Sequence, residues 1–481
     1  MADMQEYKCL SCGGGLEFNS AVQKMKCPFC DTEFEMSALK AYDEETKTAG
    51  ASDMKWDVQS SGEWGAGELD GMSVYGCQSC GGEIVGDATT AATKCPYCDN
   101  PVVMKGQFSG ALKPDYVIPF KLDKKAAENA LSNHFKGKKL LPRVFSSQHH
   151  IEEIQGLYVP FWLFDTDADA TVRYKALKKK KWSDDKFNYV ETSSYSVLRQ
   201  GTLGFTKVPV DGSTKMPDAL MESVEPYDYK DVKEFQSAYL AGYVADKYDV
   251  DAEASIARAN ERVTKSVESS FKKTVTGYDS VTPEHTAVSL KGGKVSYALL
   301  PLWLLNTNWN SEKFVFAMNG QTGKIVGNLP MDKSAFWKYF MMWFCGGAVG
   351  AVVLQILYGL IANGSVSLTV PGIVGAAVIG LLLSFFVTSG MKGQLKTVGM
   401  QARADSYEKA NSLKMRTNRD TFLFTKVEKT PKPQASTASA SATDTSTATA
   451  KPATKPATPV KPPAQVAKPG ARPGQTPSQK K

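Results

Sequence analysis

Four Cys-x-x-Cys pairs near the N-terminus are the feature that most constrains this chain of 481 residues. The pairs form two blocks that align without a gap at an offset of 68 residues, and both blocks carry Gly-Gly after their second cysteine. Such a duplication predicts two small units of the same kind. The cysteines of the first block are Cys9, Cys12, Cys27 and Cys30, and those of the second are Cys77, Cys80, Cys95 and Cys98.

Each block has the ligand set of a structural zinc site. One Cys-x-x-Cys knuckle supplies two thiolates, and two knuckles complete a tetrahedron with Zn–S distances of about 2.3 Å. Gly13 and Gly81 permit the left-handed turn that closes the first knuckle of each block. A redox dithiol would need a single pair in a βαβ setting, and an iron–sulfur cluster would need stronger burial, so zinc is favoured over both. Because four cysteines leave no position for water, we expect two structural Zn²⁺ ions and no catalytic metal.

The two blocks divide the N-terminal part of the chain into three segments. Residues 1–40 and 73–105 are predicted to be small β zinc ribbons. Residues 41–72 are predicted to be an acidic linker, whose Trp56 and Trp64 we expect to pack on a neighbouring part of the protein. Paired cysteines without an export signal in the N-terminal sequence predict a reducing compartment.

Charge is distributed unevenly along the chain. Lys and Arg number 57 against 50 Asp and Glu, but the residues from Lys429 onward hold nine basic side chains and one acid. The rest of the chain is therefore nearly neutral, which excludes a basic body that wraps nucleic acid. Both ribbons have a small acidic excess, so binding of nucleic acid by them is not favoured. Residues 430–481, rich in Pro, Ala, Thr and Lys, are predicted to be a disordered basic tail.

Residues 112–330 are predicted to form an α+β cytoplasmic domain. Apolar residues at helical spacing predict one helix over 123–135 and a longer one that begins near Asp251. The segments Val159–Thr166 and Leu300–Thr307 share the pattern Pro-x-Trp-Leu. This second internal similarity predicts two related buried strands, each of which begins at its proline.

Two apolar spans follow this domain. Residues 340–361 contain one strongly polar side chain, Gln355, and residues 368–387 contain no charge. About 20 apolar residues are enough to cross the hydrocarbon core, so the spans predict a transmembrane helical hairpin over 337–390. Lysines flank both outer ends, which predicts a two-span protein of the bacterial inner membrane with both termini in the cytoplasm.

Three further patterns lie in or near these regions. Gly346-x-x-x-Gly350 and Gly372-x-x-x-Ala376-x-x-x-Gly380 are small-residue faces that would either seal the hairpin or drive oligomers. The juxtamembrane segment 391–428 is expected to contain one strand, over 416–427. The run Lys178–Lys181 is interpreted as a solvated hairpin in preference to a contact with anionic lipid.

Motifs for catalysis are absent from the sequence. It has no phosphate-binding Gly-x-x-x-x-Gly-Lys-Ser/Thr loop, no His-Glu-x-x-His and no Gly-x-Ser-x-Gly elbow. We therefore expect that the chain is not an enzyme and that it has neither catalytic nor cofactor-binding residues besides the metal ligands.

Taken together, these features resemble a group of uncharacterised bacterial membrane proteins. That group carries tandem zinc ribbons of the transcription-factor-IIB type, a middle domain and a C-terminal transmembrane hairpin. The two ribbons and the segments YVPFWLFD, LLPLWLLNT and NGQTGKIVG carry the likeness, which extends from Tyr7 to Val427. Some such chains are labelled primosomal helicase-like. The phosphate-binding loop of a helicase motor is missing from this sequence, so the resemblance implies no reaction or substrate.

The sequence supports two hypotheses of function. The first is a membrane-anchored adaptor or scaffold, whose ribbons and middle domain organise protein partners at the cytoplasmic face. The alternative is a membrane tether that binds nucleic acid through its ribbons and tail, which requires binding that falls steeply with salt. An enzyme hidden in the middle domain is a third and weaker hypothesis.

Overall fold

The computed structural model describes residues 7–48, 50–58, 62, 64–65, 67–86, 94–107, 112–146, 151, 153–366 and 369–432. Residues Met1–Thr430 form one compact unit. Almost all of the predicted disordered tail lies outside the described residues, so that prediction stays untested.

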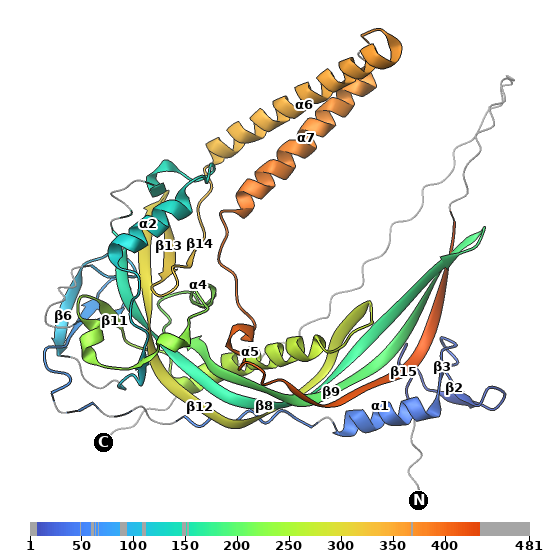
Figure 1. Cartoon of the computed structure of the whole chain (residues 1–481), viewed down its shortest axis with the longest axis horizontal. Helices are drawn as coiled ribbons and strands as arrows, with labels where there is room; N and C mark the ends of the chain where they lie inside the picture. The colour runs from blue at the N-terminus through green and yellow to red at the C-terminus, as the bar shows by residue number, and fades with distance from the viewer. Residues whose placement is uncertain are drawn as a thin grey trace, which may run out of the picture. The chain divides into compact units, whose positions relative to one another are not determined.

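Three long antiparallel strands form the centre of the unit (Figure 1). β8 (Gln155–Ser183) lies between β9 (Phe187–Asp211) and β12 (Ser280–Trp309). β15 (Lys414–Pro431) pairs with the other edge of β9 and confirms the strand expected over 416–427. Along β8, side chains from Phe164 to Val172 alternate between buried and more exposed positions, because successive residues of a strand point to opposite faces.

The two Pro-x-Trp-Leu segments lie in the paired strands β8 and β12 and run in opposite directions from the point where Val159 lies opposite Leu300. Both are buried, as predicted. The predicted entry through proline is wrong, because Pro160 and Pro301 lie inside their strands. Proline lacks an N–H group. Each proline lies where a neighbouring strand ends, and its carbonyl accepts a hydrogen bond from a glycine N–H, Gly212 at 3.0 Å and Gly320 at 2.9 Å.

Shorter elements extend the sheet on both sides of the long strands. β11 (Val244–Asp246) runs parallel to β8, whereas β13 (Glu312–Asn319) and β14 (Ile325–Gly327) continue antiparallel from β12. The sheet is therefore mixed, in agreement with an α+β domain. The remaining short elements are β7 (Tyr116–Val117), β10 (Lys233–Glu234), α4 (Asp218–Ser223) and 3₁₀ turns at Arg143–Ser146, Tyr229–Asp231, Ser237–Leu240 and Asp405–Tyr407.

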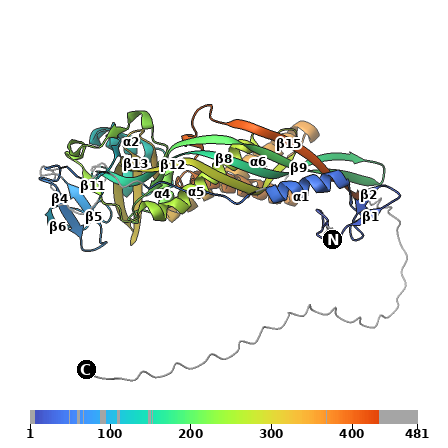
Figure 2. The same cartoon turned by 90° about the horizontal axis from the view of Figure 1, so that it is seen from below.

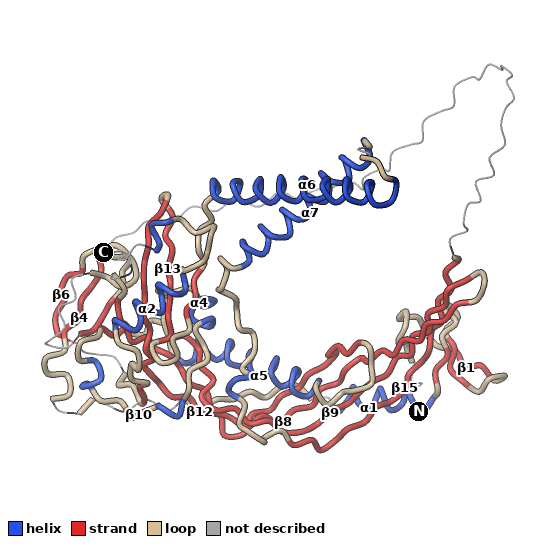
Figure 3. The backbone as a smooth tube through the Cα atoms, turned by 45° about the horizontal axis from the view of Figure 1, so that its top comes forward, coloured by secondary structure: helices blue, strands red, loops and turns tan. Residues whose placement is uncertain are grey.

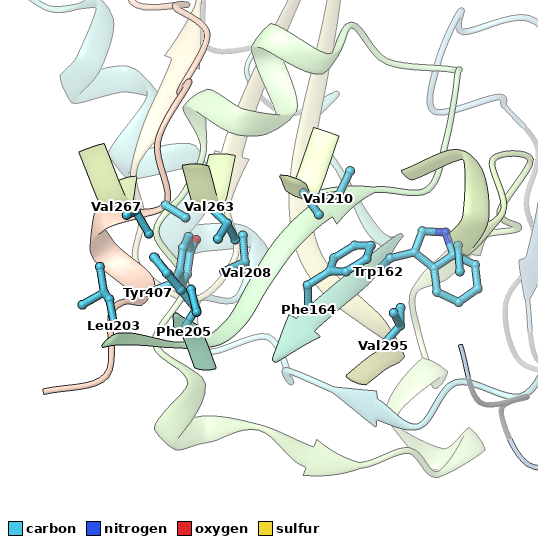
Figure 4. Packing of buried hydrophobic residues seen from close by; sticks show 14 of the residues in the cluster. Trp162, Phe164, Leu203, Phe205, Val208, Val210, Val263, Val267, Val295 and Tyr407 are labelled. Atoms are coloured by element: carbon cyan, nitrogen blue, oxygen red, sulfur yellow. The ribbon is translucent and has the colours of Figure 1, made fainter. Parts of the chain in front are cut away.

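Both predicted helices are confirmed, together with their N-caps. α2 (Lys124–Phe135) begins after Asp123, whose carboxylate accepts the Ala126 N–H, and α5 (Ala252–Lys272) begins after Asp251 in the same way. Such caps satisfy N–H groups that have no partner within the helix. Val263 and Val267 of α5 belong to the buried cluster that also holds Phe205 and Tyr407 (Figure 4).

The two cysteine blocks lie toward opposite ends of the long strands (Figures 1 and 2). The first comprises β1 (Glu17–Asn19), β2 (Lys24–Lys26) and β3 (Glu33–Phe34). Helix α1 (Met36–Thr48) follows directly and crosses residue 40, where the sequence predicted the start of a linker. Beyond α1, the expected packing of the tryptophans is confirmed. Trp56 packs edge-on against Phe164 at a ring distance of 4.9 Å, and Trp64 packs against Phe235 at 5.8 Å.

Two apolar helices leave the unit as a pair (Figure 3). α6 (Lys333–Asn363) and α7 (Val370–Gly393) are long and apolar enough to cross a membrane. Asp332 caps the start of α6, and Gly364 ends it with a left-handed φ of 65°. α6 extends beyond the predicted span 340–361 at both ends, whereas α7 begins two residues later than the predicted span 368–387 and extends beyond its end.

The contact between α6 and α7 uses only some of the predicted small residues. A side chain at Gly380 would lie 2.6 Å from the Phe344 carbonyl oxygen, and one at Gly347 would lie 3.1 Å from the Gly380 Cα. In contrast, a side chain at Gly346 or Gly350 would meet no atom of another segment within 4 Å, so this ladder does not seal the hairpin. The amide of Gln355 lies against Gly372, as expected for a polar contact between the helices.

A buried ion pair connects α5 to the rest of the unit. Arg262 and Glu225 are both fully buried, and two guanidinium nitrogens of Arg262 donate to the two carboxylate oxygens at 3.0 and 2.6 Å. The guanidinium also donates to the carbonyl of Pro209, which lies in β9, at 2.6 Å. Such a pair is costly to break, since the remaining charge stays buried without a partner.

Replacing Arg262 alone should therefore destabilise the unit strongly. We expect Arg262→Met to lower the free energy of unfolding by about 3–5 kcal/mol, and Arg262→Met with Glu225→Leu to regain most of that loss. Urea unfolding of the full chain in detergent micelles, followed by circular dichroism, measures both changes. A double variant as unstable as the single one would contradict this role of the ion pair.

Candidate metal centres

Each Cys-x-x-Cys pair folds into the same tight knuckle. The carbonyl of its first cysteine accepts the N–H of the residue four positions later, at 2.8 to 3.0 Å in all four cases. That residue has a left-handed φ in every knuckle, as predicted for the glycines and permitted for the aspartates. The four residues are Gly13 (φ 80°), Asp31 (φ 56°), Gly81 (φ 71°) and Asp99 (φ 58°).

The knuckles bring the eight cysteines together as two groups of four. Within each group the Sγ atoms lie within 4.8 Å of one another, and both groups could hold a metal ion. Cys9 and Cys30 are 3.6 Å apart and Cys12 and Cys27 3.4 Å, and the equivalent distances in the second group are 3.5 and 3.6 Å. A tetrahedron with ligand bonds of about 2.3 Å has edges of about 3.8 Å, so the spacing fits one four-coordinate ion per group.

The thiols of a group have unequal proton affinities. In the first group, the Thr32 hydroxyl lies 3.2 Å from Cys30 Sγ and lowers the pKa of Cys30 to about 6, whereas burial raises the pKa of Cys9 to about 12. In the second group, burial raises the pKa of Cys98, but hydrogen bonds from Asn100 outweigh it and the pKa falls to about 7. The lowered pKa values favour the thiolate forms of Cys30 and Cys98, and thiolates are the forms that bind a metal ion.

The second group is built into the large sheet. Its strands β4 (Ser73–Cys77), β5 (Glu83–Gly86) and β6 (Val102–Gln107) form antiparallel pairs, and β5 also pairs with β11 of the middle region. The Asn306 amide donates to the Pro96 carbonyl inside the second knuckle at 2.6 Å. The sequence predicted this ribbon as a separate unit, because no sequence pattern indicates that β11 pairs with the edge of β5.

Equivalent aromatic residues distinguish the two groups. Phe29 and Tyr97 occupy the same position between the last two cysteines, and each ring lies over the Gly-Gly of the first knuckle. Tyr97 is only 3% exposed, because the middle region covers it, whereas Phe29 is 78% exposed. The same surface is therefore used for packing in the second group and is open in the first.

The hydroxyl of Tyr97 faces a buried acidic site. Its neighbour Asp246 is buried, accepts a hydrogen bond from Ser213 Oγ at 2.6 Å, and has its pKa raised to about 7 by burial. Sequence reasoning missed this contact, since Asp246 lies far along the chain and carries no motif.

Other residues singled out in the sequence have structural surroundings. His134 lies on α2, where burial lowers its pKa to about 4, and His285 lies in β12. His149 and His150 lie outside the described residues. In the part of the chain that the structure describes, the two four-cysteine groups are the sites where three or more His, Cys, Asp or Glu ligand atoms come together.

The Asn-Gly-Gln-Thr-Gly-Lys segment forms the connection between β13 and β14, as interpreted. Asn319 donates to the Val224 carbonyl at 3.1 Å, and Gln321 accepts the Asp228 N–H at 2.8 Å. Lys324 also donates to the Glu225 carbonyl. This loop therefore holds the segment that carries the buried Glu225, which explains its polar residues without a ligand.

Removing ligands from one group should affect that group alone. One double variant combines Cys12→Ser with Cys30→Ser, and the other combines Cys80→Ser with Cys98→Ser. We expect each of them to lower the bound metal from two ions per chain to one. Only the second pair should also lower the urea midpoint of the whole unit clearly, because β5 pairs with β11. Elemental analysis by plasma mass spectrometry and urea unfolding measure these effects, and equal loss of stability in both variants would contradict the difference.

The buried Asp246 should make stability depend on pH. Because its pKa is raised in the folded state, its favourable contribution is present below the unfolded pKa near 4 and is lost as pH rises through about 7. In the wild type, this group should lower the free energy of unfolding by up to about 4 kcal/mol between pH 4 and 8, and Asp246→Asn should abolish that fall. Urea unfolding across this range tests it, and an unchanged pH profile in the variant would contradict it.

Comparison with known proteins found one similar protein that covers most of the chain. It is similar to a Bacillus subtilis (strain 168) protein described as uncharacterized protein YdjG, with 34% identity over 358 residues. The match covers 74% of this chain and 98% of YdjG. No protein-family model and no solved structure matches the chain. The identity and the nearly complete coverage of the relative mean that this chain belongs to the same family as YdjG.

Proposed function

We propose that the protein is a membrane-anchored adaptor whose first zinc ribbon binds protein partners at the cytoplasmic face of a bacterial inner membrane. The observation that carries this proposal is the exposed Phe29, because the equivalent Tyr97 is covered by the middle region. In the second ribbon, this duplicated surface packs against the middle region of the same chain. Its free copy is suited to the same kind of contact with another protein.

Zinc is the metal that best fits both sites. Four thiolates at tetrahedral spacing are the usual ligand set of structural Zn²⁺, and the ligands leave no position for water or substrate. We assign the two ions a structural role and no catalytic one. Binding would stabilise each small ribbon by on the order of 10 kcal/mol, more than its short strands can supply.

The two apolar helices would anchor the protein with both termini on one side. Lys333 and Lys338 lie at the start of α6, and Lys392 and Lys396 lie at the end of α7 or just beyond it. The positive-inside rule places these ends in the cytoplasm, on the same side as the thiol ligands, which need a reducing compartment.

Protein partners are favoured over nucleic acid for the ribbon surface. Residues 1–40 hold six acids and four basic residues, so phosphate groups would meet a negative field. The large exposed side chains Phe18 and Phe29 suit an apolar contact instead. Aromatic rings of this kind commonly anchor protein interfaces.

In-cell crosslinking followed by affinity purification tests the proposal. Phe29→Ala should reduce recovery of specific partners about tenfold or more, since an aromatic anchor contributes about 2 kcal/mol or more. Its metal content should not change. Met104→Ala, which alters an exposed apolar residue of the second ribbon, is the matched control and should keep every partner.

Two outcomes would reject the adaptor. One is full recovery of partners by Phe29→Ala and also by the first ribbon with Cys12→Ser and Cys30→Ser. The other is recovery of nucleic acid that disappears with salt and with truncation at Thr430, which would favour the membrane tether.

A further inference from the structure

The turn between β8 and β9 forms a compact basic and aromatic surface that the adaptor function does not use. We define this basic–aromatic tip as residues 178–191 together with residues 426–429 at the end of β15. It contains seven lysines and four acids, a net charge of +3. The residues of the tip between Lys178 and Lys186 are exposed, so the tip does not serve the core.

Three aromatic rings gather on one side of the tip. Trp182 lies opposite Tyr189 in the strand register, and the rings are stacked at 5.4 Å with an angle of 6°. Phe187 lies 6.4 Å from Tyr189. Trp182 is 40% exposed, and an exposed cluster of this kind needs an explanation beyond packing.

The turn holds these rings in a fixed arrangement. One carboxylate oxygen of Asp184 accepts the N–H groups of Lys186 and Phe187 at 2.8 and 2.7 Å, and the other accepts the Tyr189 hydroxyl at 2.8 Å. The Tyr189 hydrogen bond lowers the pKa of Asp184, so its charge stays in place at neutral pH. One of the four acids is therefore occupied in building the tip.

Lysines surround the rings from both neighbouring strands. Lys180 lies 6.0 Å from the Trp182 ring centre, and Lys429 lies 3.7 Å from that of Phe187. Strand alternation places Lys178 on the same face as Lys180 and Trp182. Among the residues that the structure describes, no ion pair uses a lysine of the run 178–181.

We propose that the basic–aromatic tip is a second membrane contact, which binds the surface of a bilayer that contains anionic phospholipid. Aromatic rings beside lysines are the side chains that settle at the boundary between lipid headgroups and acyl chains. Each lysine near an anionic surface contributes about 1 kcal/mol. The chain also carries its own apolar helix pair, and beyond the tip it continues into a tail whose single acid is Asp444.

The arrangement of the rings favours lipid over single-stranded nucleic acid. Stacking of bases requires free ring faces. Trp182 and Tyr189 cover one face of each other, and Lys429 lies over Phe187 and Tyr189. Trp182 is still 40% exposed, which leaves part of its surface for contact with headgroups.

Fluorescence of Trp182 in the full chain tests this proposal. The emission of Trp182→Phe is subtracted from that of wild type, and the difference is the emission of Trp182. Both proteins are measured in vesicles of phosphatidylcholine alone and in vesicles that also contain phosphatidylglycerol with brominated acyl chains. We expect the Trp182 emission to shift to the blue and to be quenched only with phosphatidylglycerol. High salt should reverse both effects, because screening weakens the contact.

Charge variants separate a lipid contact from a general effect of the vesicles. Lys178→Gln, Lys180→Gln and Lys429→Gln combined should lower the ratio of bound to free tip about fivefold per lysine, or roughly 10²-fold in total. The same change at three exposed lysines next to or within α2, Lys124, Lys125 and Lys136, should leave the ratio unchanged.

Three results would overturn the proposal. Trp182 emission could be the same in both vesicle types, or the α2 control could lose the contact as fully as the tip variant does. A single-stranded oligonucleotide that quenches Trp182 in vesicles of phosphatidylcholine alone would assign the tip to nucleic acid instead.

Discussion

The backbone hydrogen bonds on both edges of β8 are the interaction on which the unit depends. β12 pairs with this strand over most of its length, and β9 pairs with its other edge from Phe161 to Ser183. A strand bonded on both sides leaves few backbone groups unsatisfied, so it can extend through the whole unit. At one end of β8, β11 pairs with β8 and also with β5 of the second cysteine group. At the other end, β15 packs beside the first cysteine group.

The duplicated cysteine groups illustrate how one local fold takes two roles. The four knuckles have the same backbone geometry, down to the left-handed residue that closes each. What differs is the environment of one aromatic position. Tyr97 is buried beside Asp246 because the middle region covers it, whereas the described residues leave Phe29 at the surface. The difference in exposure therefore comes from what packs against each ribbon.

Three separate surfaces follow from this architecture: the exposed face around Phe29, the apolar helix pair and the basic–aromatic tip. The face around Phe29 and the tip contribute no buried side chain to the strands around β8. The helix pair contacts the core only at its base, where Phe336 and Met391 pack against the cluster that holds Trp303. The buried polar contacts lie elsewhere. Arg262 with Glu225, and the loop from Asn319 to Lys324, fix the segments that cross the sheet. Because these groups are desolvated, they specify one arrangement and tolerate little change.

Local patterns predicted several features that depend on neighbouring residues: the four knuckles, the helix that begins at Asp123, the one that begins near Asp251, the strand over 416–427 and the two apolar helices. They did not predict α1, which occupies the start of the expected linker. They could not predict contacts between distant segments. That β11 completes the edge of β5, that Pro160 lies beside the end of β9, and that Gly347 rather than Gly346 faces α7 were decided by tertiary packing. The physical reason is that ligand spacing, capping and hydropathy act over a few residues, whereas sheet edges and helix faces are satisfied by whichever segment the whole fold brings alongside.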